Sequence, residues 1–263
     1  MKIRQLQFAL IIFSGFLYSC GEALMDYDIN TKMPIVESYI QEGANSFTIK
    51  VFSMEEYLKD EIKLSKPISQ LKVKVNQTEL TETSSGVYKF DLGEDTIRGG
   101  QKYTMQFDYN GKKIEASTTV PSKINSLSVD PQYIEFESSA YYYNFHDSTQ
   151  VIVSWNDPDK SYYQVYIESP GSQSILVYGI FRRRTMQPFQ GNTYRASIRE
   201  FRTEGLHTIY VYRVDKEYAE LYERISASDL ANPVSFIQNA FGVFTSMSVA
   251  KVNVRVKDID STP

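Results

Sequence analysis

Residues 103–119 read YTMQFDYNGKKIEASTT, and this stretch decides the fold class. On both sides of Asn110-Gly111, apolar residues alternate with polar ones, which is the period of a strand with one buried face. Asn-Gly favours the two-residue hairpin turn, because both central residues of that turn need a positive φ. The stretch therefore predicts two antiparallel strands, 103–109 and 112–119, joined by a tight turn.

The same alternation extends upstream of this hairpin. It predicts further strands at residues 35–41, 47–51, 71–75 and 86–90. About seven short strands within about 90 residues are typical of a small sandwich of two antiparallel sheets. We therefore predict an N-terminal β-sandwich domain over residues 34–121.

Pro121-Ser122 interrupts the alternation, and a second β unit follows. The turn composition of residues 156–159 predicts a hairpin between strands 151–155 and 163–167. Apolar residues recur at helical spacing after Asp215, a candidate N-cap, which predicts one helix over 215–228. Further strands are expected at 126–129, 175–181, 194–198, 207–213 and 252–256. The fold class predicted is mainly β, with two tandem β-sandwich domains, the second over 126–258, and one short inserted helix.

The overall composition excludes several classes of protein. A chain of 263 residues can form two modest domains. Its single cysteine rules out an intramolecular disulfide and a multi-thiolate metal site. A formal net charge of −4 argues against a nucleic-acid partner. We expect neither a metal nor a cofactor.

The N-terminus has the organisation of a bacterial lipoprotein signal. Lys2 and Arg4 precede an apolar stretch, residues 8–17, that is too short to span a bilayer as a helix. The following Leu-Tyr-Ser-Cys ends at Cys20 and resembles a lipobox, although an ordinary secretory signal with a chance cysteine is the alternative. We predict a signal peptide over residues 1–19, lipidation of Cys20 and a lipidated tether over 20–33, which would attach the protein to a membrane.

The sequence carries no motif of a phosphate-binding loop, a zinc protease or a serine hydrolase. Triads assemble in space rather than along the chain, so a Ser-His-Asp arrangement stays open at this point. His146 and His207 fit structural or solvent-facing positions better than catalytic ones. Asp157 and Asp159 fit a turn better than a calcium site, because the Gly and Glu of an EF-hand loop are missing. We expect that the protein is not an enzyme.

An arginine cluster is the strongest local concentration of charge. It consists of Arg182, Arg183 and Arg184, with other arginines nearby. Guanidinium groups bind carboxylates and phosphates through paired hydrogen bonds. The cluster is therefore a candidate site for an anionic glycan, a lipopolysaccharide phosphate or an acidic partner. The alternative is a solvated loop that adds solubility.

A tyrosine cluster is the second local anomaly. It consists of Tyr141, Tyr142 and Tyr143, followed by Phe145. Exposed aromatic side chains stack on sugars and anchor protein interfaces. These residues are candidates for ligand or partner binding, and the alternative is a loop that packs on its own domain.

Several motifs occur after the lipobox in an order that resembles a known family. They lie at residues 34–40, 80–88, 99–103, 111–118, 153–158 and 238–244. Together they resemble a large Bacteroidota family of cell-envelope lipoproteins of unknown function, often encoded beside TonB-dependent receptors. The resemblance implies an immunoglobulin-like or transthyretin-like first domain, a fibronectin type III-like second domain and an outer-membrane location. It implies no catalytic residues.

These features favour an accessory binding protein, anchored by lipid, that works with an outer-membrane TonB-dependent receptor in nutrient capture or uptake. Its ligand would be a glycan or a peptide, and the cell surface and the periplasmic leaflet both stay open. The alternative is a structural or adhesive surface lipoprotein, such as a filament anchor or a glycan-binding adhesin. Filament subunits donate a strand, and residues 243–256 are the best candidate for one, although their alternating polar face indicates membership of a sheet.

Overall fold

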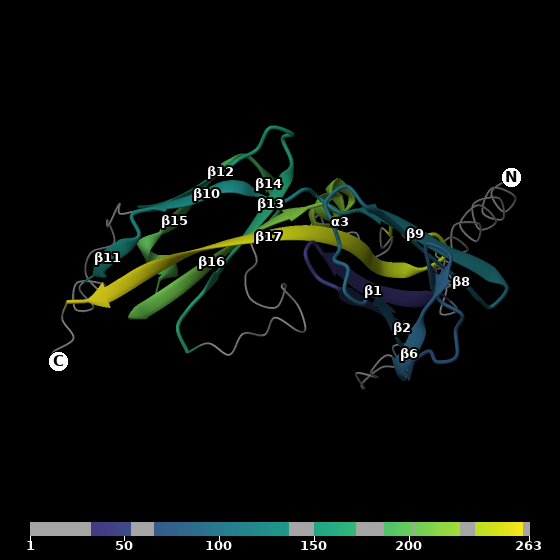
Figure 1. Ribbon diagram of the computed structural model, residues 1–263. Coiled ribbons are helices and arrows are strands. Elements are labelled where there is room, and N and C mark those ends of the chain that lie inside the picture. Colours follow the sequence, from purple (N-terminus) through teal and green to yellow (C-terminus); the bar gives the residue numbers. More distant parts are fainter. Residues whose placement is uncertain are drawn as a thin grey trace, which may run out of the picture. The chain divides into compact units, whose positions relative to one another are not determined.

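The computed structural model describes residues 33–53, 66–136, 150–171, 187–201, 203–226 and 235–259. These residues are mainly β, with the helix α3 (Lys216–Ser226), as Figure 1 shows. A short 3-10 turn (Ile198–Glu200) follows β15 (Thr193–Ser197). The predicted fold class, mainly β with one short helix, is therefore confirmed. The predicted signal peptide and nearly all of the predicted tether lie outside the described residues. Within the described ranges, no helix is long and apolar enough to cross a membrane.

The largest sheet has ten strands. They are β1 (Pro34–Gln41), β2 (Ser46–Ser53), β3 (Lys66–Pro67), β6 (Thr81–Ser84), β7 (Val87–Asp91), β11 (Tyr133–Phe136), β13 (Tyr162–Glu168), β14 (Phe189–Gln190), β16 (Gly205–Val214) and β17 (Phe241–Asp258). Eight of them run in the order β14-β13-β16-β17-β1-β2-β7-β6. In addition, β11 pairs with β17, and β3 pairs with β2.

Two smaller sheets complete the fold. The first has the order β5-β4-β8-β9, and the second has the order β10-β12-β15. Their strands are β4 (Lys74–Val75), β5 (Thr78–Glu79), β8 (Lys102–Tyr109), β9 (Lys112–Thr119), β10 (Asn125–Asp130), β12 (Gln150–Asn156) and β15 (Thr193–Ser197). Strands β8 and β9 form the predicted hairpin, in which Asn110 and Gly111 have φ angles of 50° and 73°.

Each small sheet packs against a different part of the large sheet. The first hydrophobic cluster joins Val36 and Ile49 of the large sheet to Met105 of β8. The second cluster joins Ile209 of β16 to Trp155 of β12. Alternate residues point to opposite faces of a strand, so each cluster is the interior of a two-layer sandwich.

Strand β17 belongs to both sandwiches. Its first residues, up to Met247, pair in parallel with β1, and from Met247 onward it pairs antiparallel with β16. Accordingly, Phe244 belongs to the first hydrophobic cluster and Val254 to the second. The domain predicted over 126–258 thus contributes a strand to the sheet of the domain predicted over 34–121. Residues 243–256, the candidate for a donated strand, are already paired within the sheet, residues 243–247 with β1 and residues 247–256 with β16.

The predicted hairpin of strands 151–155 and 163–167 is wrong. Strand β12 lies in the three-stranded sheet, whereas β13 lies in the ten-stranded sheet. The chain between them therefore crosses from one layer to the other. Asp157 fixes this crossing, because its Oδ1 accepts hydrogen bonds from Ser161 N at 3.0 Å and from the Tyr163 hydroxyl at 2.9 Å.

Asp215 is the N-cap of helix α3, as predicted, since its Oδ1 accepts a hydrogen bond from Tyr218 N at 2.7 Å. The other carboxylate oxygen, Oδ2, accepts hydrogen bonds from the hydroxyls of Thr118 at 2.7 Å and Thr245 at 2.9 Å. Strand β16 ends at Val214, one residue before this carboxylate. Asp215 therefore ties the start of the helix to both β9 and β17.

Candidate functional site

The predicted site residues all lie outside the part of the chain that the structure describes. They are Cys20, the tyrosine cluster of Tyr141, Tyr142 and Tyr143, and the arginine cluster of Arg182, Arg183 and Arg184. Lipidation of Cys20 and the binding roles of both clusters therefore stay predictions. The described residues present two other surfaces, one on the ten-stranded sheet and one on the four-stranded sheet.

The first surface lies where strands β13, β16, β17 and β11 follow one another in the large sheet. Arg255 of β17 is in register with Leu206 of β16 on one side and with Tyr133 of β11 on the other. Residues in register share a face of a sheet, so these three side chains lie next to one another. We call this surface the open face. Its members are Tyr133, Tyr166, Glu168, Leu206, Thr208, Tyr210, Lys251, Asn253 and Arg255.

The open face exposes large apolar side chains. Leu206 is 48% exposed and Tyr133 is 45% exposed, whereas Val254 and Val256, on the opposite face of β17, are buried in the second hydrophobic cluster. Large apolar side chains that gather on an accessible surface are typical of interaction sites. The sequence missed this surface, because the pairing of β11 with β17 has no local signal.

Tyr210 is held in a fixed position on the open face. Its ring centroid lies 6.1 Å from that of Tyr166, and 6.2 Å from that of Tyr212, whose ring is nearly parallel to it. Its hydroxyl donates a hydrogen bond to Glu168 Oε2 at 2.8 Å. Burial, and then the Glu168 carboxylate, raise the pKa of Tyr210 to about 12. The phenol is therefore neutral and a hydrogen-bond donor at physiological pH.

Helix α3 covers the part of the sheet next to the open face. Tyr218 of the helix belongs to a cluster with Tyr212 and Met247, and Tyr166 and Tyr210 pack against this cluster. Tyr166 and Tyr210 are therefore supported from one side by this cluster and remain partly accessible.

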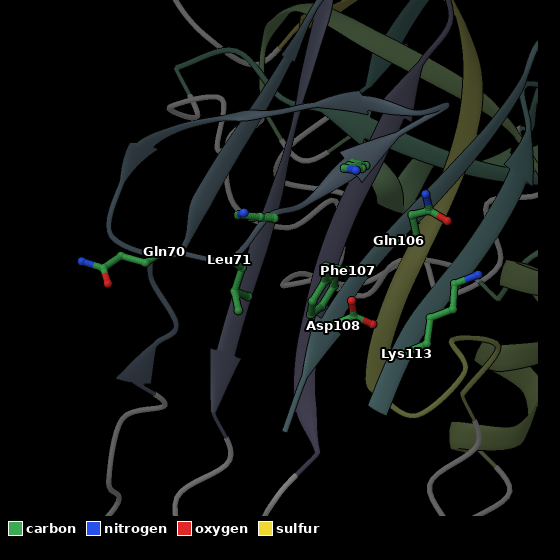
Figure 2. Close-up of a pocket in the computed structure, with 8 residues that line it drawn as sticks. Gln70, Leu71, Gln106, Phe107, Asp108 and Lys113 are labelled. Atoms are coloured by element: carbon green, nitrogen blue, oxygen red, sulfur yellow. The ribbon is translucent and has the colours of Figure 1, made fainter. Parts of the chain in front are cut away.

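The second surface is a pocket of about 570 Å³ on the four-stranded sheet. Figure 2 shows Gln70 and Leu71 on one side of it and Gln106, Asp108 and Lys113 on the other. Its lining consists of Gln70, Leu71, Lys72, Lys74, Gln106, Phe107, Asp108 and Lys113. We call it the lysine pocket.

One wall of the lysine pocket is fixed by side chains from neighbouring strands. The buried Tyr88 hydroxyl donates to Ile68 O at 2.9 Å and accepts from Leu71 N at 3.0 Å. The Glu82 carboxylate accepts from Gln70 N at 2.8 Å. The strand predicted at 71–75 is therefore shorter in the structure. Residues 71–73 belong to no strand, and only residues 74–75, which form β4, pair with neighbouring strands.

Glu82 also accepts a hydrogen bond from Gly86 N at 2.9 Å. The two backbone donors, first Gln70 and then Gly86, lower the pKa of the Glu82 carboxyl. Gln70 itself has a φ of 62°, a left-handed conformation that is rare outside glycine. Strained backbone of this kind is often found at binding sites.

The other described residues that were considered for chemistry have structural contacts, and His146 lies outside the described residues. His207 is buried, with Nε2 2.6 Å from Thr203 O and its ring against Phe201. Asp157 holds the turn before β13, and Asp159 Oδ2 accepts from Arg213 Nη2 at 2.7 Å. In the described ranges, no three His, Cys, Asp or Glu side chains are grouped so that they would hold a metal ion.

Comparison with known proteins assigns a family. The chain belongs to the family described as a domain of unknown function (DUF4249), whose model matches residues 23–258. The search of curated proteins gave no match. Among solved structures, the chain is similar to one titled "Crystal structure of Dpr11 IG1 bound to DIP-gamma IG+IG2". The identity is 8% and the TM-score 0.19, over 86% of this chain and 98% of that chain.

Proposed function

We propose that this member of a family of unknown function is a lipid-anchored binding protein of the bacterial cell envelope. It works with an outer-membrane TonB-dependent receptor in nutrient capture or uptake. The observation that carries the proposal is the open face, where Leu206, Arg255 and Tyr133 lie side by side across three strands.

The side chains of the open face have the composition of a protein interface. Tyrosine and arginine are the residue types that contribute most to binding energy at such interfaces. Here Tyr133 and Leu206 flank Arg255, and Lys251 and Glu168 add charges of both signs. A partner that covers Leu206 and Tyr133 would remove apolar surface from water at about 25 cal/mol per Å².

The scaffold under the open face favours tight binding. Strands β16 and β17 pair over ten consecutive residues, from Gly205 to Val214. Side chains on such a scaffold lose little backbone freedom when they bind, so less of the interaction energy is lost to ordering. This rigidity supports the proposal that the open face binds a partner without first rearranging its backbone.

The membrane location in this proposal rests on the sequence. The lipobox at Cys20 provides the anchor, and the described structure begins at residue 33, just before β1. The tether between them would let the protein reach a receptor in the same membrane. A glycan or peptide ligand at the arginine and tyrosine clusters is part of the same proposal, and both leaflets of the outer membrane stay open.

A co-purification experiment in the bacterium that produces the protein tests the proposal. The tagged full-length lipoprotein is isolated from detergent-solubilised outer membranes, and its partners are quantified by mass spectrometry. We expect a TonB-dependent receptor in near-equal amount, and at least a tenfold loss of it with Leu206→Asp, which places a charge in the open face. Phe236→Asp is the matched control, because Phe236 is 38% exposed and does not belong to the open face.

Two outcomes would contradict the proposed function. One is recovery of the lipoprotein alone, or with filament subunits, in place of a receptor. The other is an equal loss of receptor with Phe236→Asp, since the effect of the charge would then not depend on the open face.

A further inference from the structure

We propose that the lysine pocket binds an acidic carbohydrate, a ligand that combines an anionic group with hydroxyl groups. The inference rests on the charge, the arrangement and the rigidity of the pocket lining. It does not depend on the receptor partner proposed above, because the pocket and the open face lie on different sheets.

The pocket is a positive region on a chain whose formal net charge is −4. Its lining has three lysines, Lys72, Lys74 and Lys113, against the carboxylate of Asp108, and Lys113 is paired with Glu115 beside the pocket, which leaves a local charge of +1. A concave positive site attracts anions from a distance beyond direct contact.

Two of these lysines form no ion pair among the residues that the structure describes. Lys113 pairs with Glu115, but neither Lys72 nor Lys74 forms an ion pair with any described residue. Glu79 is in register with Lys74 across the β4–β5 ladder without pairing with it. An anion placed between the two amino groups would gain charge-assisted hydrogen bonds without breaking an existing pair.

The lysines share a face with amide side chains. Lys72 and Lys74 alternate with the fully buried Val73 and Val75, so both point away from the first hydrophobic cluster. Lys74 is in register with Gln106 of the neighbouring strand β8. Gln106 Nε2 donates to Gln77 Oε1 at 3.4 Å, so Gln106 Oε1 can accept a hydrogen bond from a hydroxyl group of a ligand whose anionic group contacts the lysines.

The lining is also prepared for binding. The Tyr88 hydroxyl and the Glu82 carboxylate hold the wall at residues 68–71 through backbone hydrogen bonds of 2.8–3.0 Å. Fixing this segment in advance lowers the entropy lost on binding. The volume of about 570 Å³ is within the range of small-molecule pockets and is too large for one inorganic anion.

Isothermal titration of the full-length protein in detergent tests the inference. The probes are trigalacturonate, which is anionic, a neutral galactose trisaccharide of the same length, and inorganic phosphate. We expect binding of trigalacturonate, weaker binding at higher salt, and about a tenfold or greater loss of affinity in Lys72→Gln/Lys74→Gln, the loss of roughly 1.4 kcal/mol. The neutral trisaccharide and phosphate should bind at least tenfold more weakly than trigalacturonate.

The control variant is Lys123→Gln/Lys216→Gln, which removes the same charge from exposed positions outside the pocket. An equal loss of trigalacturonate affinity in this control would overturn the inference, since the attraction would then be due to overall charge. It would also be overturned if the neutral sugar bound as tightly as trigalacturonate, or if phosphate did. Unfolding curves of all variants show whether the fold is retained. If the double pocket variant unfolds, Gln106→Ala replaces it, and an unchanged affinity in that variant would overturn the inference.

Discussion

Arg213 Nη2 lies 2.7 Å from Asp159 Oδ2, and this ion pair is part of a larger contact that joins three segments of the chain. Nη1 of the same side chain donates to Ser122 Oγ at 2.6 Å, and Nε donates to Ser161 Oγ at 2.9 Å. Ser122 lies where the sequence predicts the domain boundary. The guanidinium thus connects that junction to β16 and to the turn before β13.

Arg213→Ala should lower the free energy of unfolding by about 2 kcal/mol, because the buried guanidinium satisfies several polar groups at once. Asp159→Asn should cost less than about 1 kcal/mol, because the Asp159 side chain is 62% exposed and its charge is screened by water. Urea unfolding of both variants measures the difference. Equal losses would show that the ion pair, rather than the full set of contacts, carries the stability.

Asp215→Ala should also destabilise the fold by about 2 kcal/mol. The change removes the N-cap of α3 and the acceptor for the Thr118 and Thr245 hydroxyls. Lys216→Ala is the control, because Lys216 is exposed and its pair with Glu220 is of the weak i,i+4 type. The measurement is urea unfolding followed by tyrosine near-UV circular dichroism, and similar midpoints for the two variants would contradict the prediction.

Gly242→Ala should destabilise the fold by more than about 3 kcal/mol. Gly242 has a φ of 107°, and an added Cβ would lie 1.9 Å from Val36 O, a backbone atom of β1 that cannot move without breaking the β1–β17 ladder. Gly43→Ala is the matched control. Gly43 also has a positive φ, of 83°, but an added Cβ there meets no atom within 4 Å, so only the conformational cost of about 1 kcal/mol remains.

The sequence predicted the parts of the fold that depend on residues close together in the chain, and it missed the parts that depend on residues far apart. The alternation and the Asn110-Gly111 turn are local, and the β8–β9 hairpin was predicted in full. The β1–β17 pairing joins residues about 200 positions apart, and no local pattern encodes such a partner. The lysine pocket was missed for the same reason, since Tyr88 and Glu82 act on a wall that lies some 15 residues away in the sequence.

Tyr210 should make the open face sensitive to alkali. Folding raises the pKa of Tyr210 from 10.0 to about 12. Between these two pH values the phenol is protonated in the folded protein but ionised in the unfolded chain. The stability that it contributes is therefore complete below pH 10 and is lost as the pH rises toward 12. Tyr210→Phe should reduce this loss and should remove a late step from the tyrosinate absorbance titration. An unchanged titration would contradict the assignment.

Glu82 should give the wall of the lysine pocket an acid-sensitive contribution to stability. Its backbone hydrogen bonds lower the pKa of the carboxyl below the ordinary value of 4.5, so the ionised form is favoured in the folded protein. This contribution is present above pH 4.5 and is lost as the pH falls through the lower folded value. Urea midpoints of Glu82→Gln and the unmodified protein should therefore differ at pH 7 and converge in acid, because protonation and the amide both remove the charge. A difference that stays constant down to pH 3 would mean that Glu82 acts through packing rather than through its charge.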